Sequence, residues 1–175
     1  MENQRTKYMS LQLRAPETLL VSHRLDEFRC GEPLLDDWLK RRALSNQLSG
    51  ASRTFVVADQ AQRIYGYYAI ATGAVSHPIA TSNVRRNMPD PIPVMVLARL
   101  AVDIQAQGIK LGASLLQDAV MRTVAVSHHA GVRALMVHAI NDRAKQFYEH
   151  YGFQVSPAQS MTLMLRLSGL RSLVA

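Results

Sequence analysis

The stretch Leu97-Ala-Arg-Leu-Ala-Val-Asp103, followed closely by Gln107-Gly-Ile-Lys-Leu-Gly112, decides the fold of this chain. Its first part belongs to an apolar run, Val94–Val102, which predicts a central strand buried on both faces. The second part is a short turn with two glycines, and a helical run begins at Ala113. Such a turn directs backbone N–H groups and the positive end of a helix dipole toward one point. The pattern therefore predicts a pyrophosphate-binding turn between a strand and a helix.

A second candidate catalytic segment is Asn141-Asp-Arg-Ala-Lys-Gln-Phe-Tyr148-Glu-His-Tyr-Gly-Phe153. It predicts a helix over Asp142–Tyr151, preceded by a buried strand over Val132–Ala139. Tyr148 has a phenol with an ordinary pKa of about 10, so it is protonated at neutral pH and can donate to a thiolate, whose conjugate acid has a pKa of about 8.5. Taken alone, Tyr148 is more simply a packed aromatic residue. Its place in the order strand, turn, helix, strand, Asn, helix favours an acid.

The remaining chain alternates strands and helices without internal repeats. This order predicts an α+β fold with a mixed sheet. We expect a short edge strand within residues 11–21, a helix over Glu32–Leu48, a hairpin of Arg53–Asp59 and Ile64–Val75, a long surface loop over His77–Pro93 with up to one helical turn, and a final strand over Met161–Leu167.

Length and composition fit one compact enzyme. The chain has 175 residues, of which 48% are hydrophobic, enough for a sizeable core. We assign residues 1–10 to a flexible N-terminal tail and residues 11–170 to a single domain. The single cysteine, Cys30, excludes an internal disulfide and fits a reducing cytoplasm. No apolar run approaches the roughly 20 residues of a membrane span, so no membrane association is expected.

The chain is basic, with 20 Lys and Arg against 13 Asp and Glu, a formal net charge of +7. Such a balance predicts a polyanionic partner, nucleic acid above all. Two basic groups are candidate contacts. Arg85 and Arg86 lie in the long loop before the central strand, and Lys40 and Arg42 lie on the first long helix.

Other polar residues have simpler interpretations. His128 and His129 lie at a predicted helix end, and we expect no metal site. His138 is interpreted as a core residue or as a residue at the rim of a cofactor site, and Cys30 as a small buried hydrophobic residue. Asp36 and Asp37 are expected on a solvated helix face.

Several segments between about Pro16 and Leu167 share one family likeness. They are Phe28-Arg-Cys-Gly31, Leu35-Asp-Asp-Trp-Leu39, Ser52-Arg-Thr-Phe-Val-Val57, Gly66-Tyr-Tyr68, Pro93-Val-Met-Val-Leu-Ala-Arg-Leu-Ala-Val-Asp103, Gly131-Val-Arg-Ala-Leu-Met-Val-His138 and Ala144-Lys-Gln-Phe-Tyr148. With these segments the chain resembles the GNAT-fold toxins of type II toxin–antitoxin modules, the TacT/AtaT-like group. The resemblance implies the GNAT fold, a mixed central sheet splayed between its fourth and fifth strands and flanked by helices.

The resemblance also implies an activity, the transfer of acetyl from acetyl-CoA to the α-amine of the amino acid on charged tRNA, which blocks translation. Tyr148 would be the catalytic residue, Leu100 to Val102 would pair with the pantetheine arm, and Asn141 would border the cosubstrate. A bulge near Leu100–Val102 would also aim backbone N–H groups at the thioester carbonyl. The expected acetyl-CoA-binding residues are Leu100, Ala101, Val102, Gln107, Gly108, Lys110, Leu111, Gly112, Ala113 and Asn141.

The phosphate turn departs from the superfamily pattern Gln/Arg-x-x-Gly-x-Gly/Ala. Aligning its last position with Gly112 places Lys110 where the first glycine belongs, whereas the register over residues 105–110 recovers Gly108 but fits the helix stripe less well. We prefer the first register. If φ of Lys110 is positive, a non-glycine residue costs on the order of 1 kcal/mol. Contact of its ammonium with phosphate would offset this strain, and weakened acetyl-CoA affinity is the competing outcome.

The residues alone leave the acceptor and the partners open. An α-amine has a pKa of about 7.7–8.0 against about 10.4 for lysine, and no buried base is evident, which favours the α-amine. The alternatives are an N-acetyltransferase acting on a small amine or a protein amine, and a non-enzymatic DNA-binding co-repressor subunit. The resemblance implies aminoacyl-tRNA, a cognate antitoxin of the ribbon-helix-helix type and a second copy of the chain as partners. Operator DNA would be bound, and transcription repressed, only through the antitoxin complex.

Overall fold

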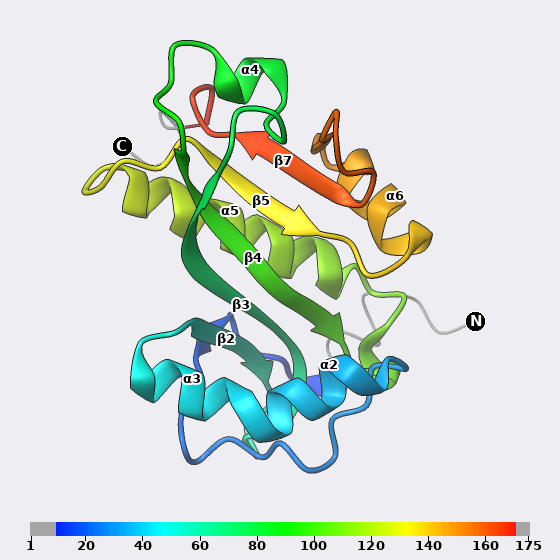
Figure 1. Cartoon of the computed structure of the whole chain (residues 1–175). Helices are drawn as coiled ribbons and strands as arrows, with labels where there is room; N and C mark the ends of the chain where they lie inside the picture. The colour runs from blue at the N-terminus through cyan, green and yellow to red at the C-terminus, as the bar shows by residue number, and fades with distance from the viewer. Residues whose placement is uncertain (1–9, 171–175) are drawn as a thin grey trace. The chain divides into compact units, whose positions relative to one another are not determined.

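The computed structural model describes residues 10–170, so nearly all of the tail predicted over residues 1–10 lies outside the described residues. The described chain alternates strands and helices as expected (Figure 1). The strands are β1 (Glu17–Thr18), β2 (Arg53–Ala58), β3 (Ile64–Val75), β4 (Ile92–Val102), β5 (Ala134–His138), β6 (Gln154–Val155) and β7 (Thr162–Arg166). The helices are α2 (Pro33–Trp38), the π-helical η1 (Leu39–Ala43), α3 (Leu44–Ser49), α4 (Ser82–Arg85), the 3₁₀ turn η2 (Ile104–Ala106), α5 (Leu111–Ser127) and α6 (Asp142–His150).

The strands form one mixed sheet in the order β1-β2-β3-β4-β5-β7-β6. β4 and β5 run parallel, whereas β1–β2, β2–β3, β5–β7 and β6–β7 are antiparallel pairs. The parallel ladder joins Val94–Leu97 to Ala134–Val137, although β4 itself continues to Val102. A ladder that stops before its strand ends is the arrangement expected of a sheet splayed between its fourth and fifth strands. The predicted α+β class and mixed sheet are confirmed.

The chain divides into two compact units. The first comprises the residues up to Ile70 together with Arg99–Ala119, and the second comprises Ala71–Ala98 and the residues from Val120 onward. The strands β3 and β4 and the helix α5 each contribute residues to both units. The single domain over residues 11–170 stays a prediction.

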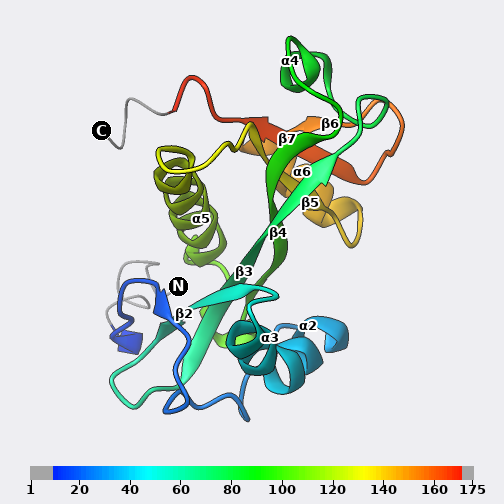
Figure 2. The same ribbon diagram turned by 60° about the vertical axis from the view of Figure 1, so that its left-hand side comes forward.

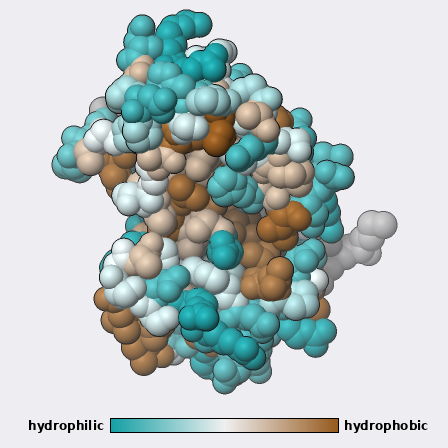
Figure 3. All heavy atoms as spheres, viewed as in Figure 1, coloured by the Kyte–Doolittle hydropathy of each residue, from teal (hydrophilic) through white to brown (hydrophobic). Residues whose placement is uncertain are grey.

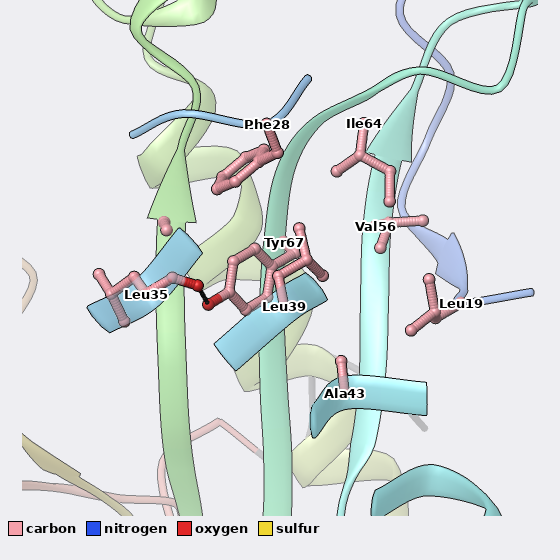
Figure 4. Packing of buried hydrophobic residues seen from close by; sticks show 9 residues of the cluster. Leu19, Phe28, Leu35, Leu39, Ala43, Val56, Ile64 and Tyr67 are labelled. Carbon is pink, nitrogen blue, oxygen red and sulfur yellow. Dashed lines mark hydrogen bonds between the residues drawn. The ribbon is translucent and has the colours of Figure 1, made fainter. Parts of the chain in front are cut away.

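The first unit has a core in which helical residues pack on strand residues (Figure 4). Tyr67 lies at its centre: its buried hydroxyl donates to the carbonyl oxygen of Leu35 at 2.6 Å, and its ring meets that of Phe28 edge-on at 5.5 Å. Trp38 stacks on the Tyr67 ring at 6.0 Å with an interplanar angle of 7°. The core comprises Leu19, Phe28, Leu35, Leu39, Ala43, Val56, Ile64, Tyr67 and Ala101.

The helix predicted over Glu32–Leu48 forms as three consecutive segments, α2, η1 and α3. Pro33 occupies its first turn, where a missing N–H breaks no hydrogen bond. Gly50 ends it in the left-handed conformation, with φ of +83°. The π-helical turn η1 was not predicted, because a locally widened turn leaves the apolar stripe of Leu35, Leu39 and Ala43 readable as an ordinary α-helix.

The second unit has a separate core that includes the segment predicted as a surface loop. Ala80 and Val84 are fully buried against residues of β4, β5 and β7, and Ile79 and Met88 pack around them. The short helix α4 lies beside β7 (Figure 2). The loop over His77–Pro93 is therefore anchored by its own apolar residues, and of its polar residues Thr81 is also buried.

Several predicted boundaries were wrong by a few residues. The edge strand within residues 11–21 pairs only at Glu17–Thr18, because Pro16 lacks the N–H that a longer ladder needs. The helix expected from Ala113 begins earlier, at Leu111. The two-residue strand β6 was missed, since so short a segment has no periodicity.

Candidate active site

The predicted phosphate turn leads from β4 into α5 within the first unit. Gly108 and Lys110 both have left-handed backbones, with φ of +81° and +62°. Lys110 immediately precedes Leu111, the first residue of α5. The positive φ confirms the condition set for Lys110 in the preferred register, so this residue carries strain on the order of 1 kcal/mol that glycine would avoid.

The start of α5 presents backbone donors. Ser114 N–H bonds the carbonyl oxygen of Lys110 at 3.2 Å, which begins the helical hydrogen-bond pattern. The N–H groups of Leu111, Gly112 and Ala113 precede this bond and by helical geometry have no acceptor within the helix. The exposed side chain of Lys110 adds a positive charge next to these donors. Together they form a suitable anion site for a pyrophosphate.

Gln107 and Asp103 brace this turn against a distant loop. The Gln107 side-chain amide donates to the carbonyl oxygens of Cys30, at 3.1 Å, and Val102, at 3.0 Å. The Asp103 carboxylate accepts the N–H of Arg29 and that of Gln105, both at 2.9 Å. The side chain of Gln107 therefore shapes the turn, whereas direct contact with acetyl-CoA through its backbone stays a prediction.

The strand residues predicted to pair with the pantetheine arm end β4. Ala101 is buried in the core of the first unit, so strand alternation directs Leu100 and Val102 to the opposite face of the sheet, where both are half-buried. The N–H of Asp103 bonds the carbonyl oxygen of Tyr65 at 2.8 Å and so fixes the end of the strand. The bulge near Leu100–Val102 stays a prediction.

Tyr148 lies on α6 in the second unit and is buried, with 6% of its surface exposed. Its ring contacts Phe147 edge-on at 5.2 Å and Phe153 at 5.5 Å. Burial in these aromatic surroundings raises the pKa of the Tyr148 hydroxyl above its ordinary value, because the phenolate would be poorly solvated. The hydroxyl therefore keeps its proton at all physiological pH values.

Asn141 begins the same helix. Its side-chain oxygen accepts the N–H of Ala144 at 2.8 Å, a standard N-cap that fixes where α6 starts. Tyr148 follows two helical turns later, so the cap also sets the position of the phenol. The contact of Asn141 with acetyl-CoA stays a prediction.

The four candidate tRNA contacts differ in exposure. Lys40 is half-buried and Arg42 exposed, both in the π-helical turn of the first unit. In the second unit Arg86 is exposed, whereas Arg85 is half-buried and donates from Nη1 to the carbonyl oxygen of His77 at 3.4 Å. No local sequence pattern predicts this difference between the two neighbours.

The contacts of two arginines were not predicted from the sequence. The Arg99 guanidinium lies over the Trp38 ring at 5.2 Å in the first unit. Arg133, at the start of β5, hydrogen-bonds three carbonyl oxygens around α4 in the second unit. No local sequence pattern predicts these contacts, because the partners are dozens of residues apart in the chain.

The remaining candidates mostly have structural explanations. Cys30 is half-buried and so is not the buried residue that was predicted, and partial burial raises the pKa of its thiol to about 12. Asp36 accepts the N–H of Cys30 at 2.9 Å, so its expected placement on a merely solvated face was wrong, whereas Asp37 is exposed. His138 is exposed and bonds Thr162 Oγ1 at 2.8 Å, so it is not a core residue.

Within residues 10–170 no three His, Cys, Asp or Glu side chains gather as a metal site would require. None of the helices in the described part of the chain has the length and apolar character needed to cross a membrane.

Comparison with known proteins identifies the family. Residues 26–162 match the acetyltransferase (GNAT) domain family. The chain belongs to the GNAT acetyltransferase family. It is 46% identical over 160 residues to a tRNA-acetylating toxin of Mycobacterium tuberculosis, an alignment that covers 91% of this chain and 96% of the relative.

Solved structures of GNAT toxins share the fold. A tyrosine-to-phenylalanine mutant of KacT superimposes with a TM-score of 0.86 at 25% identity, covering 93% of this chain and 99% of KacT. AtaTR bound with acetyl-CoA has a TM-score of 0.80 at 25% identity, covering 94% and 99%. Other neighbours are AtaT complexed with acetyl-methionyl-tRNA, AtaT bound to the C-terminus of the antitoxin AtaR, and a KacTA–DNA complex. The predicted GNAT membership is confirmed.

Proposed function

We propose that this GNAT acetyltransferase is the toxin of a type II toxin–antitoxin module. It transfers acetyl from acetyl-CoA to the α-amine of the amino acid on charged tRNA and thereby blocks translation. The observation that carries this proposal is the 46% identity to a tRNA-acetylating toxin across nearly the whole length of both chains. The basic charge of +7 agrees with a nucleic-acid substrate.

The first unit supplies the acetyl-CoA-binding turn. The N–H groups of Leu111, Gly112 and Ala113 hold the pyrophosphate at the start of α5, where the helix dipole favours negative charge. The Lys110 ammonium lies next to them and pairs with a phosphate oxygen. The backbone of Leu100 to Val102 pairs with the pantetheine arm.

Tyr148 on α6 is the proton donor. The neutral α-amine attacks the thioester carbon, a C–N bond forms, the C–S bond breaks, and the sulfur leaves as a thiolate. Tyr148 donates a hydrogen bond to the developing thiolate and then its proton, and it regains one from the amine nitrogen through solvent. Burial raises the pKa of Tyr148, so the phenol is protonated at neutral pH. The same shift makes it a weaker acid, so the proton moves to the sulfur only as the C–S bond breaks and the amine nitrogen loses its own proton.

The acceptor is an α-amine because an α-amine is less basic than a lysine amine. At neutral pH an α-amine with a pKa of about 7.7–8.0 is partly uncharged, and the ester bond to tRNA lowers this value further. A lysine amine with a pKa of about 10.4 would need a base to remove its proton. The chemistry assigned to Tyr148 provides an acid and no such base.

The proposal extends to partners. The protein acts in the cytoplasm as a homodimer and is inhibited by a cognate antitoxin of the ribbon-helix-helix type. Operator DNA is bound only through the antitoxin complex, which represses transcription of the module. The solved KacTA–DNA complex and the AtaT–AtaR complex bound to DNA support the binding of DNA through an antitoxin complex.

The test incubates the purified protein with radiolabelled acetyl-CoA and either total charged tRNA, deacylated tRNA, or a lysate from which RNA has been removed. We expect label in charged tRNA alone, released by mild base as an N-acetyl amino acid. Label that enters proteins or small amines, with none in charged tRNA, would overturn the proposal. Tyr148→Phe is the matched control for enzymatic transfer.

A further inference from the structure

The loop that contains α4 is held by hydrogen bonds from Arg133, just before β5, from Ser156 and from the loop itself. The Arg133 guanidinium donates from Nε to the carbonyl oxygen of Val84 at 3.0 Å, and from Nη2 to those of Asn83 at 3.0 Å and Arg86 at 3.1 Å. One side chain thus binds three backbone carbonyl oxygens within a single turn around the end of α4. All of these residues belong to the second unit.

Two further side chains, Ser156 and His77, secure the same loop on either side of α4. Ser156 Oγ donates to the carbonyl oxygen of Ile79 at 2.6 Å, before α4. After α4, His77 Nε2 lies 3.0 Å and 2.9 Å from the carbonyl oxygens of Met88 and Pro89. Ala80 and Val84 anchor the loop because their side chains are buried in the core of the second unit. The backbone that carries Arg85 and Arg86 is therefore preorganised.

The two neighbouring arginines have different roles in this loop. Arg85 is half-buried and turns back to donate to the carbonyl oxygen of His77. Arg86 is exposed, and its own carbonyl oxygen is one of the three that Arg133 binds. Arg133 therefore fixes the backbone from which the Arg86 side chain projects into solvent.

The surroundings of the loop favour an anionic partner. The charged and titratable groups of the loop are His77, Arg85, Arg86 and Asp90, and Arg133, just before β5, contributes a further positive charge. Asp90 Oδ1 accepts the N–H of His77 at 3.3 Å, at the far end of the loop. The surface over α4 is mainly hydrophilic (Figure 3).

We propose that Arg86 contacts a phosphate of the tRNA backbone and that Arg133 is the positioning residue that holds Arg86 in place. This inference rests on the proposed tRNA acetyltransferase activity and assigns two residues to substrate binding. A guanidinium presented on a fixed backbone forms charge-assisted bonds to phosphate with a smaller loss of conformational entropy than one on a mobile loop. Arg85 braces the loop and makes no phosphate contact.

The first experiment measures tRNA binding by fluorescence anisotropy over a range of salt concentrations, alongside steady-state acetylation. We expect Arg86→Gln to raise both Kd and KM for charged tRNA about tenfold and to reduce the slope of log Kd against log salt by about one. kcat and the KM for acetyl-CoA should not change. Arg53→Gln, at an exposed position of β2, is the control for the loss of one surface charge.

The second experiment is a double-mutant cycle. Arg133→Gln should raise the KM for charged tRNA three- to tenfold, Arg133→Lys should restore part of the loss, and Arg133→Gln should have no further effect in an Arg86→Gln background. Additive effects would show that Arg133 binds tRNA directly and would overturn its positioning role. A change in the KM for acetyl-CoA in Arg133→Gln would also overturn it.

The outcomes for the two proposals are distinguishable. If the wild-type protein binds tRNA but acetylates none, the proposed function fails, whereas the anisotropy data still test Arg86. If the wild-type protein acetylates charged tRNA and Arg86→Gln behaves as Arg53→Gln does, only the inference about Arg86 fails.

Discussion

The Asp103 carboxylate accepts the backbone N–H of Arg29, 74 positions earlier in the chain, through a 2.9 Å hydrogen bond. The same carboxylate caps the 3₁₀ turn by accepting the N–H of Gln105, and Arg63 Nη2 lies 3.7 Å from it. Ile104 N–H returns a bond to the carbonyl oxygen of Arg29 at 2.8 Å. The start of the turn that leads into α5 is thus fixed by one buried side chain and a distant loop.

Removal of this carboxylate should destabilise the protein. Asp103→Ala leaves two backbone N–H groups without their acceptor in a site where the aspartate is 1% exposed, so we expect a loss of about 2–4 kcal/mol in the free energy of unfolding. Asp103→Asn keeps one acceptor oxygen and should lose less. Urea denaturation measures both, with the exposed Asp37→Ala as control. A loss in Asp103→Ala no larger than that in Asp37→Ala would contradict the bracing role.

Tyr148→Phe should keep the fold and acetyl-CoA binding but lower acetyl transfer at least about 100-fold, the usual contribution of a general acid. Only the hydroxyl is removed, and the ring contacts with Phe147 and Phe153 remain. Radiolabel transfer to charged tRNA and thermal unfolding give the two readouts. Full activity in this variant would exclude Tyr148 as the acid.

Substitutions of Lys110 separate backbone strain from phosphate contact. Lys110→Ala keeps the unfavourable positive φ and loses the ammonium, so acetyl-CoA should bind about tenfold more weakly with little change in stability. Lys110→Gly relieves the strain, so the protein should gain about 1 kcal/mol of stability and lose less affinity. Calorimetric titration and thermal unfolding check both. Tighter binding in both variants would show that Lys110 obstructs the cosubstrate.

Cys30 should be inert to alkylation. Its pKa is raised from 9.0 to about 12, so below pH 9 the folded protein holds almost no thiolate. We expect iodoacetamide at pH 8 to react at least ~100-fold more slowly with folded protein than with urea-unfolded protein, since the thiolate is the nucleophile. The stability linked to this thiol is complete below about pH 9 and is lost as pH rises toward 12. Equal rates in the two states would contradict the burial.

Local sequence was sufficient wherever neighbouring residues decide the outcome. The apolar run ending at Val102 predicted β4, and the motif position of Lys110 identified the residue that the structure shows with a positive φ. Asn141 and Tyr148 could be placed because a cap and a helix two turns long are local features. The π-helical turn and β6 could not be predicted from local sequence, since neither has a periodic pattern of its own.

The sequence by itself determined the element order, the phosphate turn and the identity of the candidate acid, because backbone conformation and helical periodicity depend on residues a few positions apart. Only the tertiary structure decided that Asp103 and Gln107 brace the turn and that Arg133 holds the backbone of Arg86. It also decided that Arg85 turns inward while Arg86 faces solvent. These relationships join residues that come together only when the chain folds. Local sequence patterns do not predict hydrogen bonds between such residues.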